Sequence, residues 1–187
     1  MRIDSQLSFV PLGSPLSLVA GAGVSTPSQV LDLLGVGVGV APPSIIGLTP
    51  IVGTTHVFGT DFGIGEDRVL LDVVTGTAFA TGDACTLNVA LQLAADTGLS
   101  GGYQPGTWYT AVETGPQAVA NLTANTRIAR FDWPPAFPEN LRPRYARLLF
   151  QVPSGEYFTT GTIAFALVTP ARDDYAAAYA AKNFSVS

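Results

Sequence analysis

The amino-acid sequence predicts an all-β protein, an antiparallel sandwich or barrel with little helix. Three observations carry this prediction. Apolar and polar side chains alternate with a period of two along several stretches, which is typical of strands that bury one face. Turn-forming residues separate these stretches roughly every 8 to 15 residues, and helical periodicity is confined to short pieces. With 187 residues, the chain is long enough for one domain with a sizeable core.

The clearest alternation lies in the last third of the chain, from Arg144 to Val152 and again from Thr162 to Val168. Each run has one face that is apolar, as expected of a half-buried strand. A turn signal, Pro153-Ser-Gly155, follows the first run. We therefore expect the two runs to pair as a β-hairpin at the centre of a sheet. The predicted inward positions are Leu148, Phe150, Ile163, Phe165 and Leu167.

Further strands are expected along the rest of the chain. In order, they are residues 3–10, 54–59, 68–75, 86–93, 107–113 and 126–131, with a short apolar piece at 118–122. The single histidine, His56, lies in one of these runs among apolar neighbours, so a structural role is expected. The single cysteine, Cys85, alternates with Leu87, which predicts a buried thiol.

Residues 11–50 form an unusual segment that is rich in Gly, Pro, Ser and Val. Ser28–Leu34 is expected to form a turn or two of helix, and the remainder an ordered loop or extended arm that packs on something. The tail 171–187 is rich in alanine and predicts either a short helix or an extended arm. The predicted organisation is therefore one sandwich domain, residues 1–170, with an inserted arm at about 11–50 and a C-terminal tail at 171–187.

Charged residues make up only 12% of the chain, about half of the usual share. So few charges cannot cover the surface, and we expect some neutral surface to be buried against another chain. The net charge of −5, without a basic cluster, argues against nucleic acid as a partner. Neither of the long uncharged stretches, Ser5–Leu31 and Leu33–Thr60, holds about 18 unbroken apolar residues, so no membrane span is predicted. The start of the chain lacks the basic and apolar regions of a signal peptide.

The sequence offers little material for catalysis. One histidine and one cysteine exclude a His/Cys zinc site of the usual kind. The carboxylates that cluster in sequence do not have the alternating positions of a calcium loop, so a polar turn is expected; they are Asp61, Glu66, Asp67 and Asp72. Tyr103, Trp108 and Tyr109 lie near a Gly-rich loop and could stack on a sugar, but packing is the favoured interpretation. We expect no enzyme activity, no cofactor and no metal.

Several short motifs occur in a characteristic order. They are Ile3–Gln6 with Phe9, Phe62–Glu66 leading into Val69–Val74, Thr86–Gln92 ending at Asp96, Ala120–Leu122, Arg144–Leu148, and Phe158–Ile163 with Ala166. In these motifs and their spacing the sequence resembles the Bbp16-like capsid cement (decoration) proteins of tailed bacteriophages. The resemblance covers residues 1–9 and about 51–170, whereas residues 11–50 depart from the family pattern as an insertion or elaborated arm.

This resemblance implies a jelly-roll-like β-sandwich with extended loops or arms. It also implies a homotrimer on the outer capsid surface of the virion, which bridges neighbouring major capsid proteins and has no catalytic residues. The alternative is a carbohydrate- or receptor-binding β-sandwich of a phage tail. Neither reading calls for a nucleic-acid or membrane partner.

The predicted contact residues for such an assembly come from composition and expected exposure. They are Val36, Val38, Val40, Pro42 and Pro43 of the arm, Trp133 and Phe137 of the Pro-aromatic connection, Arg142 and Arg144 before the strand, and Tyr175, Tyr179 and Phe184 of the tail.

Overall fold

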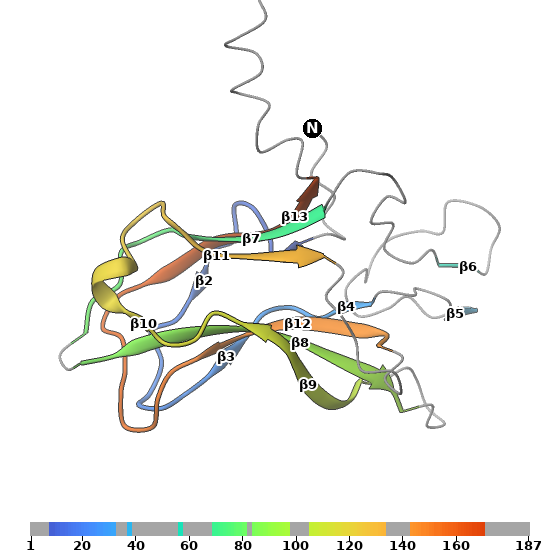
Figure 1. The fold of residues 1–187 in the computed structure, drawn as a ribbon, viewed down its shortest axis with the longest axis horizontal. Coiled ribbons are helices and arrows are strands. Elements are labelled where there is room, and N and C mark those ends of the chain that lie inside the picture. The colour runs from blue at the N-terminus through green and yellow to red at the C-terminus, as the bar shows by residue number, and fades with distance from the viewer. Residues whose placement is uncertain are drawn as a thin grey trace, which may run out of the picture.

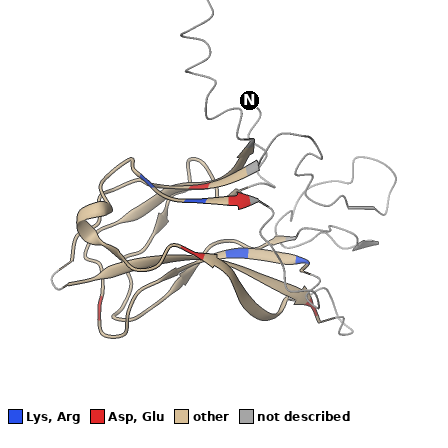
Figure 2. Ribbon diagram, in the orientation of Figure 1, with Lys and Arg blue, Asp and Glu red and all other residues tan. Residues whose placement is uncertain are grey.

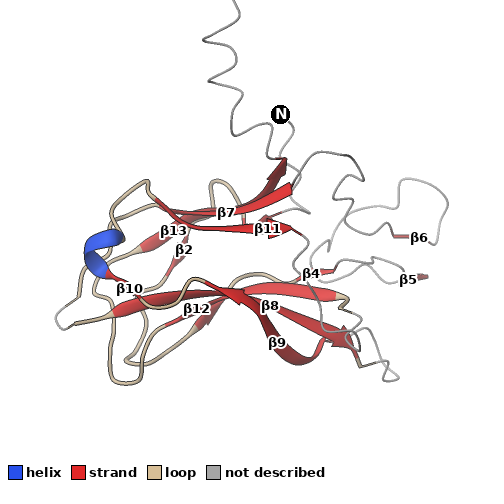
Figure 3. Cartoon of the chain, viewed as in Figure 1, coloured by secondary structure: helices blue, strands red, loops and turns tan. Residues whose placement is uncertain are grey.

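The computed structural model confirms the all-β antiparallel sandwich (Figure 1). It describes residues 8–32, 37–38, 56–57, 69–81, 84–97, 105–133 and 143–170. Two sheets pack face to face, and within the described residues the helical structure is one 3-10 turn, η3 (Val119–Asn121), drawn blue in Figure 3. The expectation of little helix therefore holds for this part of the chain.

Five strands make the first sheet and six make the second. The first sheet contains β1 (Ser8–Val10), β2 (Leu16–Ser17), β7 (Val69–Thr75), β11 (Arg127–Trp133) and β13 (Thr162–Pro170). The second contains β3 (Thr26–Pro27), β4 (Leu31–Asp32), β8 (Thr86–Asp96), β9 (Pro105–Glu113), β10 (Gln117–Ala118) and β12 (Tyr145–Gln151). Two further short strands, β5 (Gly37–Val38) and β6 (His56–Val57), pair with each other.

The strand order is the same in both sheets because the chain crosses between them at one end. The first sheet runs β1/β2-β13-β7-β11, and the second runs β3/β4-β12-β8-β9/β10. The crossings connect β2 to β3, β7 to β8, β10 to β11 and β12 to β13, and they lie together at the left of Figure 1. The sandwich is thus one antiparallel sheet of four long chain segments folded over on itself. We call this end the crossover end and the opposite end the open end.

Backbone hydrogen bonds continue from each sheet through the crossover end. They run from the Leu18 N–H to the Gly161 carbonyl, from the Ala80 N–H to the Thr160 carbonyl, and from the Phe79 N–H to the Leu122 carbonyl, at 3.1, 3.1 and 3.0 Å. A paired backbone at the crossings satisfies polar groups that burial would otherwise leave costly. The crossover end is therefore a continuation of the sheets and not a set of independent loops.

The predicted hairpin between the last two strands is wrong. β12 pairs with β8, β3 and β4, whereas β13 pairs with β1, β2 and β7, so the two strands lie in different sheets. The predicted turn does form, because the Glu156 N–H donates to the Pro153 carbonyl at 3.1 Å and Gly155 has φ of 85°. The chain then continues across to the first sheet instead of doubling back. Both strands are central, as expected, but each in its own sheet.

A bulge in β13 changes which of its side chains face inward. Opposite β7, the register shifts between Ile163 and Phe165, so that one residue is left without a partner. After the bulge the inward positions are Ala166 and Val168, which join the core. The predicted inward position of Phe165 is therefore wrong, because this residue is only partly buried, whereas Leu167 is buried at 3% exposed. In β12, by contrast, Leu148 and Phe150 are fully buried as predicted.

The predicted helical turn at Ser28–Leu34 is also wrong where it is described. Leu31 and Asp32 form β4, and Leu31 pairs with Ala146 of β12. Leu31 is fully buried, so core packing at this position outweighs the local preference. The described part of the segment 11–50 adds short strands to both sheets through β2, β3 and β4, and in this sense it packs as expected.

The core lies between the two sheets. It contains large buried side chains from β1, β7, β8, β11, β12 and β13, including Phe9, Leu71, Leu91, Phe131, Phe150 and Ile163, whereas β9 adds only the partly buried Ala111 and Val112. Cys85 is 3% exposed and belongs to this core, which confirms the prediction of a buried thiol. Phe79 and Phe158 close the crossover end, with their rings in an edge-to-face contact at 4.9 Å between centroids.

Candidate functional site

Arg144 lies just before β12 and was predicted to contact a neighbouring chain. The structure places its side chain inside this chain, where the residue is 6% exposed. Its Nη1 lies 2.6 Å from Asp96 Oδ2, and its guanidinium stacks over the Tyr145 ring at 5.3 Å. Arg144 therefore joins the end of β8 to the start of β12, and this structural role accounts for it.

The other predicted contact residues lie largely outside the described residues. Val38 is in β5 opposite His56, and Trp133 ends β11 opposite Val69, but the side chains of all four are not described. The remaining predicted contacts fall outside the description; they are Val36, Val40, Pro42, Pro43, Phe137, Arg142, Tyr175, Tyr179 and Phe184.

These residues belong to segments that leave the sandwich at one end. The chain departs from or returns to the described sandwich at Ser8, Asp32, Val69, Thr97, Pro105, Trp133, Pro143 and Pro170. These positions are at or next to the start of β1, β7, β9 and β12 and the end of β4, β8, β11 and β13, and these strand ends lie away from the crossings (Figure 1). Apart from residues 82–83, every stretch outside the description is attached there. The molecule is therefore polarised between a hydrogen-bonded crossover end and an end that carries the connecting and terminal segments.

A row of polar and aromatic side chains crosses the outer face of the second sheet. Arg147 Nε donates to Gln92 Oε1 at 2.9 Å, and the Arg147 guanidinium lies 4.2 Å from the centroid of the Trp108 ring. Burial lowers the pKa of Arg147 below its usual value. One face of the Trp108 ring is thus covered by a cation within the same chain. Tyr109 is 51% exposed.

The same face continues toward the crossover end through Asn88. Its Nδ2 donates to Glu113 Oε2 at 2.8 Å and to Gln151 Oε1 at 2.7 Å. Its Oδ1 accepts a hydrogen bond from Thr114 Oγ1 at 3.3 Å. These contacts connect β9, β8 and β12, and they use the polar groups to hold the strands together.

Asp72 is the one member of the predicted carboxylate cluster that is described. It points to the outer face of the first sheet, where it is 7% exposed. Arg130 binds it with two hydrogen bonds, Nε to Oδ1 at 2.8 Å and Nη2 to Oδ2 at 3.1 Å, and Arg127 Nε lies 3.0 Å from Oδ1. The carboxylate is thus engaged in a structural ion pair between β7 and β11. Asp61, Glu66 and Asp67 lie outside the described residues.

Taken together, the described arginines are all bound within the chain. Arg127 and Arg130 bind Asp72, Arg144 binds Asp96, and Arg147 binds Gln92 and Trp108. Within the described ranges, no group of three or more His, Cys, Asp or Glu residues is placed to hold a metal ion. These four arginines therefore connect strands within the sandwich.

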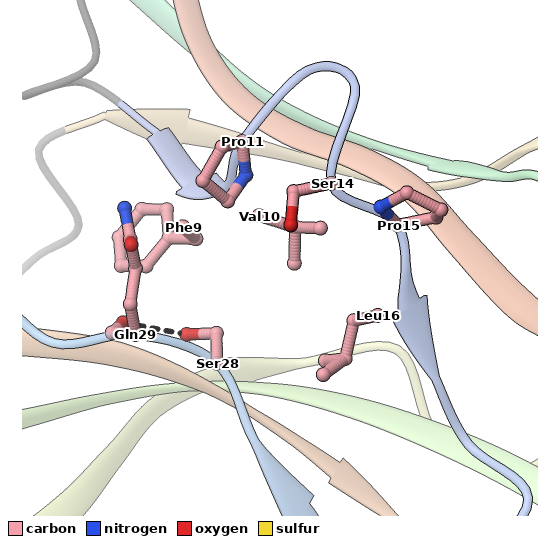
Figure 4. A pocket seen from close by; sticks show the side chains of 8 residues that line it. All are labelled: Phe9, Val10, Pro11, Ser14, Pro15, Leu16, Ser28 and Gln29. Atoms are coloured by element: carbon pink, nitrogen blue, oxygen red, sulfur yellow. Dashed lines mark hydrogen bonds between the residues drawn. The ribbon is translucent and has the colours of Figure 1, made fainter.

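One apolar pocket opens at the edge where β1 and β2 meet the segment after β3 (Figure 4). Its volume is about 220 Å³. It is lined by Phe9, Val10, Pro11, Ser14, Pro15, Leu16, Ser28 and Gln29. Sequence reasoning missed it, although the prolines that interrupt the strands on both sides of residues 12–14 were a usable signal.

Ser28 and Gln29 fix the floor of this pocket. Ser28 Oγ accepts a hydrogen bond from the Leu148 N–H at 2.9 Å and donates to the Gln29 carbonyl at 2.8 Å. The Gln29 side-chain amide donates to the Ser8 carbonyl, and its backbone N–H donates to the Phe9 carbonyl at 3.3 Å. The pocket is therefore built on a rigid bridge between the two sheets.

No protein-family model and no curated protein sequence matches the chain. In the described part of the chain, no helix is long and apolar enough to cross a membrane.

Proposed function

We propose that this protein is a capsid cement (decoration) protein of a tailed bacteriophage. In this proposal it binds the outer surface of the virion as a homotrimer and bridges neighbouring major capsid proteins. The observation that carries the proposal is the polarised sandwich. A cement protein needs a rigid body together with segments that reach across subunit joints, and here the chain leaves and re-enters the described sandwich at the open end, apart from residues 82–83.

The chemistry of the described residues supports a structural role. Arg127 and Arg130 form ion pairs with Asp72, Arg144 forms one with Asp96, and the amide groups of Asn88 and Gln92 join strands. The chain also has only 12% charged residues, which favours burial of neutral surface against other subunits. The motifs that resemble the Bbp16-like family point to the same class of protein.

The stabilisation would come from several modest contacts acting together. A single specific interface buries on the order of 1,200–2,000 Å². A trimer that engages several capsid subunits at once gains avidity beyond that of one contact. Because the protein would bind the assembled shell and not the free subunits, mass action would shift the equilibrium toward the intact shell.

The test uses particles made with and without this chain. Particles that lack it are expected to release DNA at a lower temperature and to rupture more readily on osmotic shock. Adding back the purified protein is expected to restore both properties. The control is the variant Asn88→Ala, which is altered away from the open end and is expected to restore them as well. Particles that are equally stable in both forms, and that do not bind the added protein, would contradict the proposal.

A further inference from the structure

We propose that the edge of the sandwich formed by residues 8–31 is a self-association surface, on which Leu12 of one copy enters the apolar pocket of a second copy. This surface would be the one through which the proposed trimer assembles, and to that extent the inference rests on the proposed function. The contacts themselves are between copies of this chain and do not involve the capsid.

This edge of the molecule carries no formal charge. From Ser8 to Leu31 the sequence contains no Asp, Glu, Lys or Arg. The strands concerned, β2 and β3, are free of blue and red in Figure 2, whereas charged residues lie on β7, β11, β8 and β12. Removing charged groups from water is a large cost of forming an interface. Two such edges can meet without this cost because residues 8–31 carry no charged side chain.

The most exposed apolar side chain lies on this edge. Among the described residues, five large hydrophobic side chains are exposed, and Leu12, in the turn between β1 and β2, is the most exposed of them at 62%. Val19 at 52% and Val24 at 48% lie further along, in the crossing from β2 to β3. Moving an exposed leucine side chain from water into an apolar pocket is favourable.

Leu12 lies next to the pocket, but its side chain does not fill the pocket of its own chain. Leu12 lies at the tip of the turn from Pro11 to Ser14, closed by a hydrogen bond from the Ser14 N–H to the Pro11 carbonyl at 3.1 Å. Both ends of this turn line the pocket, yet Leu12 itself does not, and Gly13 has φ of 85° at the tip. The turn holds Leu12 out toward solvent beside the opening.

The size of the pocket fits this occupant. An apolar cavity of about 150 Å³ is large enough to hold benzene, and the pocket measures about 220 Å³. A leucine side chain has fewer carbon atoms than benzene, so its volume is smaller than that of the pocket. The walls are apolar, from Phe9, Val10 and Leu16, and they match an aliphatic group.

The experiment measures the oligomeric state of the full chain by size-exclusion chromatography with light scattering over a concentration series. Leu12→Asp places a charge where the apolar group docks, and Ser14→Trp fills the mouth of the pocket from an exposed position. Tyr109→Asp is the matched control, because Tyr109 is 51% exposed on β9 at the other edge of the second sheet. Far-UV circular dichroism and the melting temperature show whether each variant is folded.

The wild-type chain and Tyr109→Asp are expected to form the same oligomer. Leu12→Asp and Ser14→Trp are each expected to raise the dissociation constant between subunits at least tenfold while remaining folded. A monomeric wild-type chain would overturn the inference, as would unchanged association of either variant. If the variants still oligomerise and still bind capsids, the self-association surface is refuted and the proposed function is not. If the variants dissociate as expected but the wild-type oligomer never binds capsids, the proposed function is refuted and the self-association surface is not.

Discussion

At the scale of single residues, Cys85 shows how the core controls a reactive group. The thiol is 3% exposed, and burial, helped by the nearby Glu156 carboxylate, raises its pKa from 9.0 to about 11. The thiol is therefore protonated across the physiological range, and its neutral form suits the apolar core. The residue belongs to the packing of the protein and not to its chemistry.

This raised pKa predicts a pH dependence of stability. The contribution of the protonated thiol is fully present below about pH 9 and is lost as the pH rises toward about 11, because the unfolded chain releases the proton first. The free energy of unfolding of the wild type should thus fall more steeply over this window than that of Cys85→Ala. Urea titrations at several pH values measure the difference. Parallel curves for the two proteins would contradict the assignment.

Asp72 is a buried carboxylate that binds two arginines of β11. Asp72→Asn removes the charge that binds Arg127 and Arg130 while keeping the shape of the side chain. Because the aspartate is buried and the arginines are partly exposed, we expect a loss of about 2 kcal/mol in the free energy of unfolding.

Urea denaturation measures this loss, and the control is Glu113→Gln. Glu113 is an exposed carboxylate that bonds to Asn88, and its replacement should change stability by less than about 0.5 kcal/mol. Equal effects of the two substitutions would show that Asp72 has no special structural role.

At the scale of elements, the sequence predicted most strands but not their partners. The alternation of side chains located β7, β8, β9, β11, β12 and β13 to within a few residues. Strand pairing is set by contacts that are distant in sequence, such as Leu148 opposite Leu91, and no local pattern encodes them. The turn residues at 153–155 predicted a hairpin. This prediction failed because a turn alone does not reveal whether the chain returns to the same sheet or crosses to the other one.

The same limitation explains the errors within individual elements. The bulge in β13 shifts its phase after Ile163, and a two-residue period read from sequence cannot anticipate an inserted residue. Arg144 was predicted as a contact because arginine is usually exposed, but its pairing with Asp96 depends on β8 and β12 lying side by side. The pocket beside Leu16 was missed because it is formed by segments from both sheets.

The crossing from β12 to β13 depends on Gly161. Its φ is 143°, which other residues rarely adopt, and a Cβ at this position would lie 2.2 Å from Phe79 Cδ1. Gly161→Ala is expected to cost about 3 kcal/mol or more, because it combines backbone strain with a clash against a core ring. Thermal unfolding and the yield of soluble protein measure the effect.

Gly115→Ala provides the matched control for this prediction. Gly115 also has a positive φ, of 73°, but a Cβ there would meet nothing within 4 Å. The expected cost is only about 1 kcal/mol, from the backbone alone. If Phe79→Leu fails to recover any of the stability lost in Gly161→Ala, the steric part of the explanation is wrong.

At the scale of the whole molecule, the crossings between the sheets lie at one end of the sandwich, and the chain leaves and re-enters the described sandwich at the other. Four chain segments fold over at the crossover end and hold each other through backbone hydrogen bonds. The segments 33–68, 98–104, 134–142 and 171–187 are attached to the sandwich at the open end. Within the first of these segments, only β5 and β6 are described. Most of the predicted contact residues belong to these segments, so the open end is where we expect the capsid to be engaged.

We propose that this chain binds the outside of a capsid and bridges its subunits, and a cryo-EM reconstruction of the phage particle tests this proposal. We expect density for the sandwich on the outer surface, in groups of three, with the open end toward the major capsid proteins and the crossover end toward solvent. A shell without density for this chain, or a chain found only at the tail, would refute the proposal.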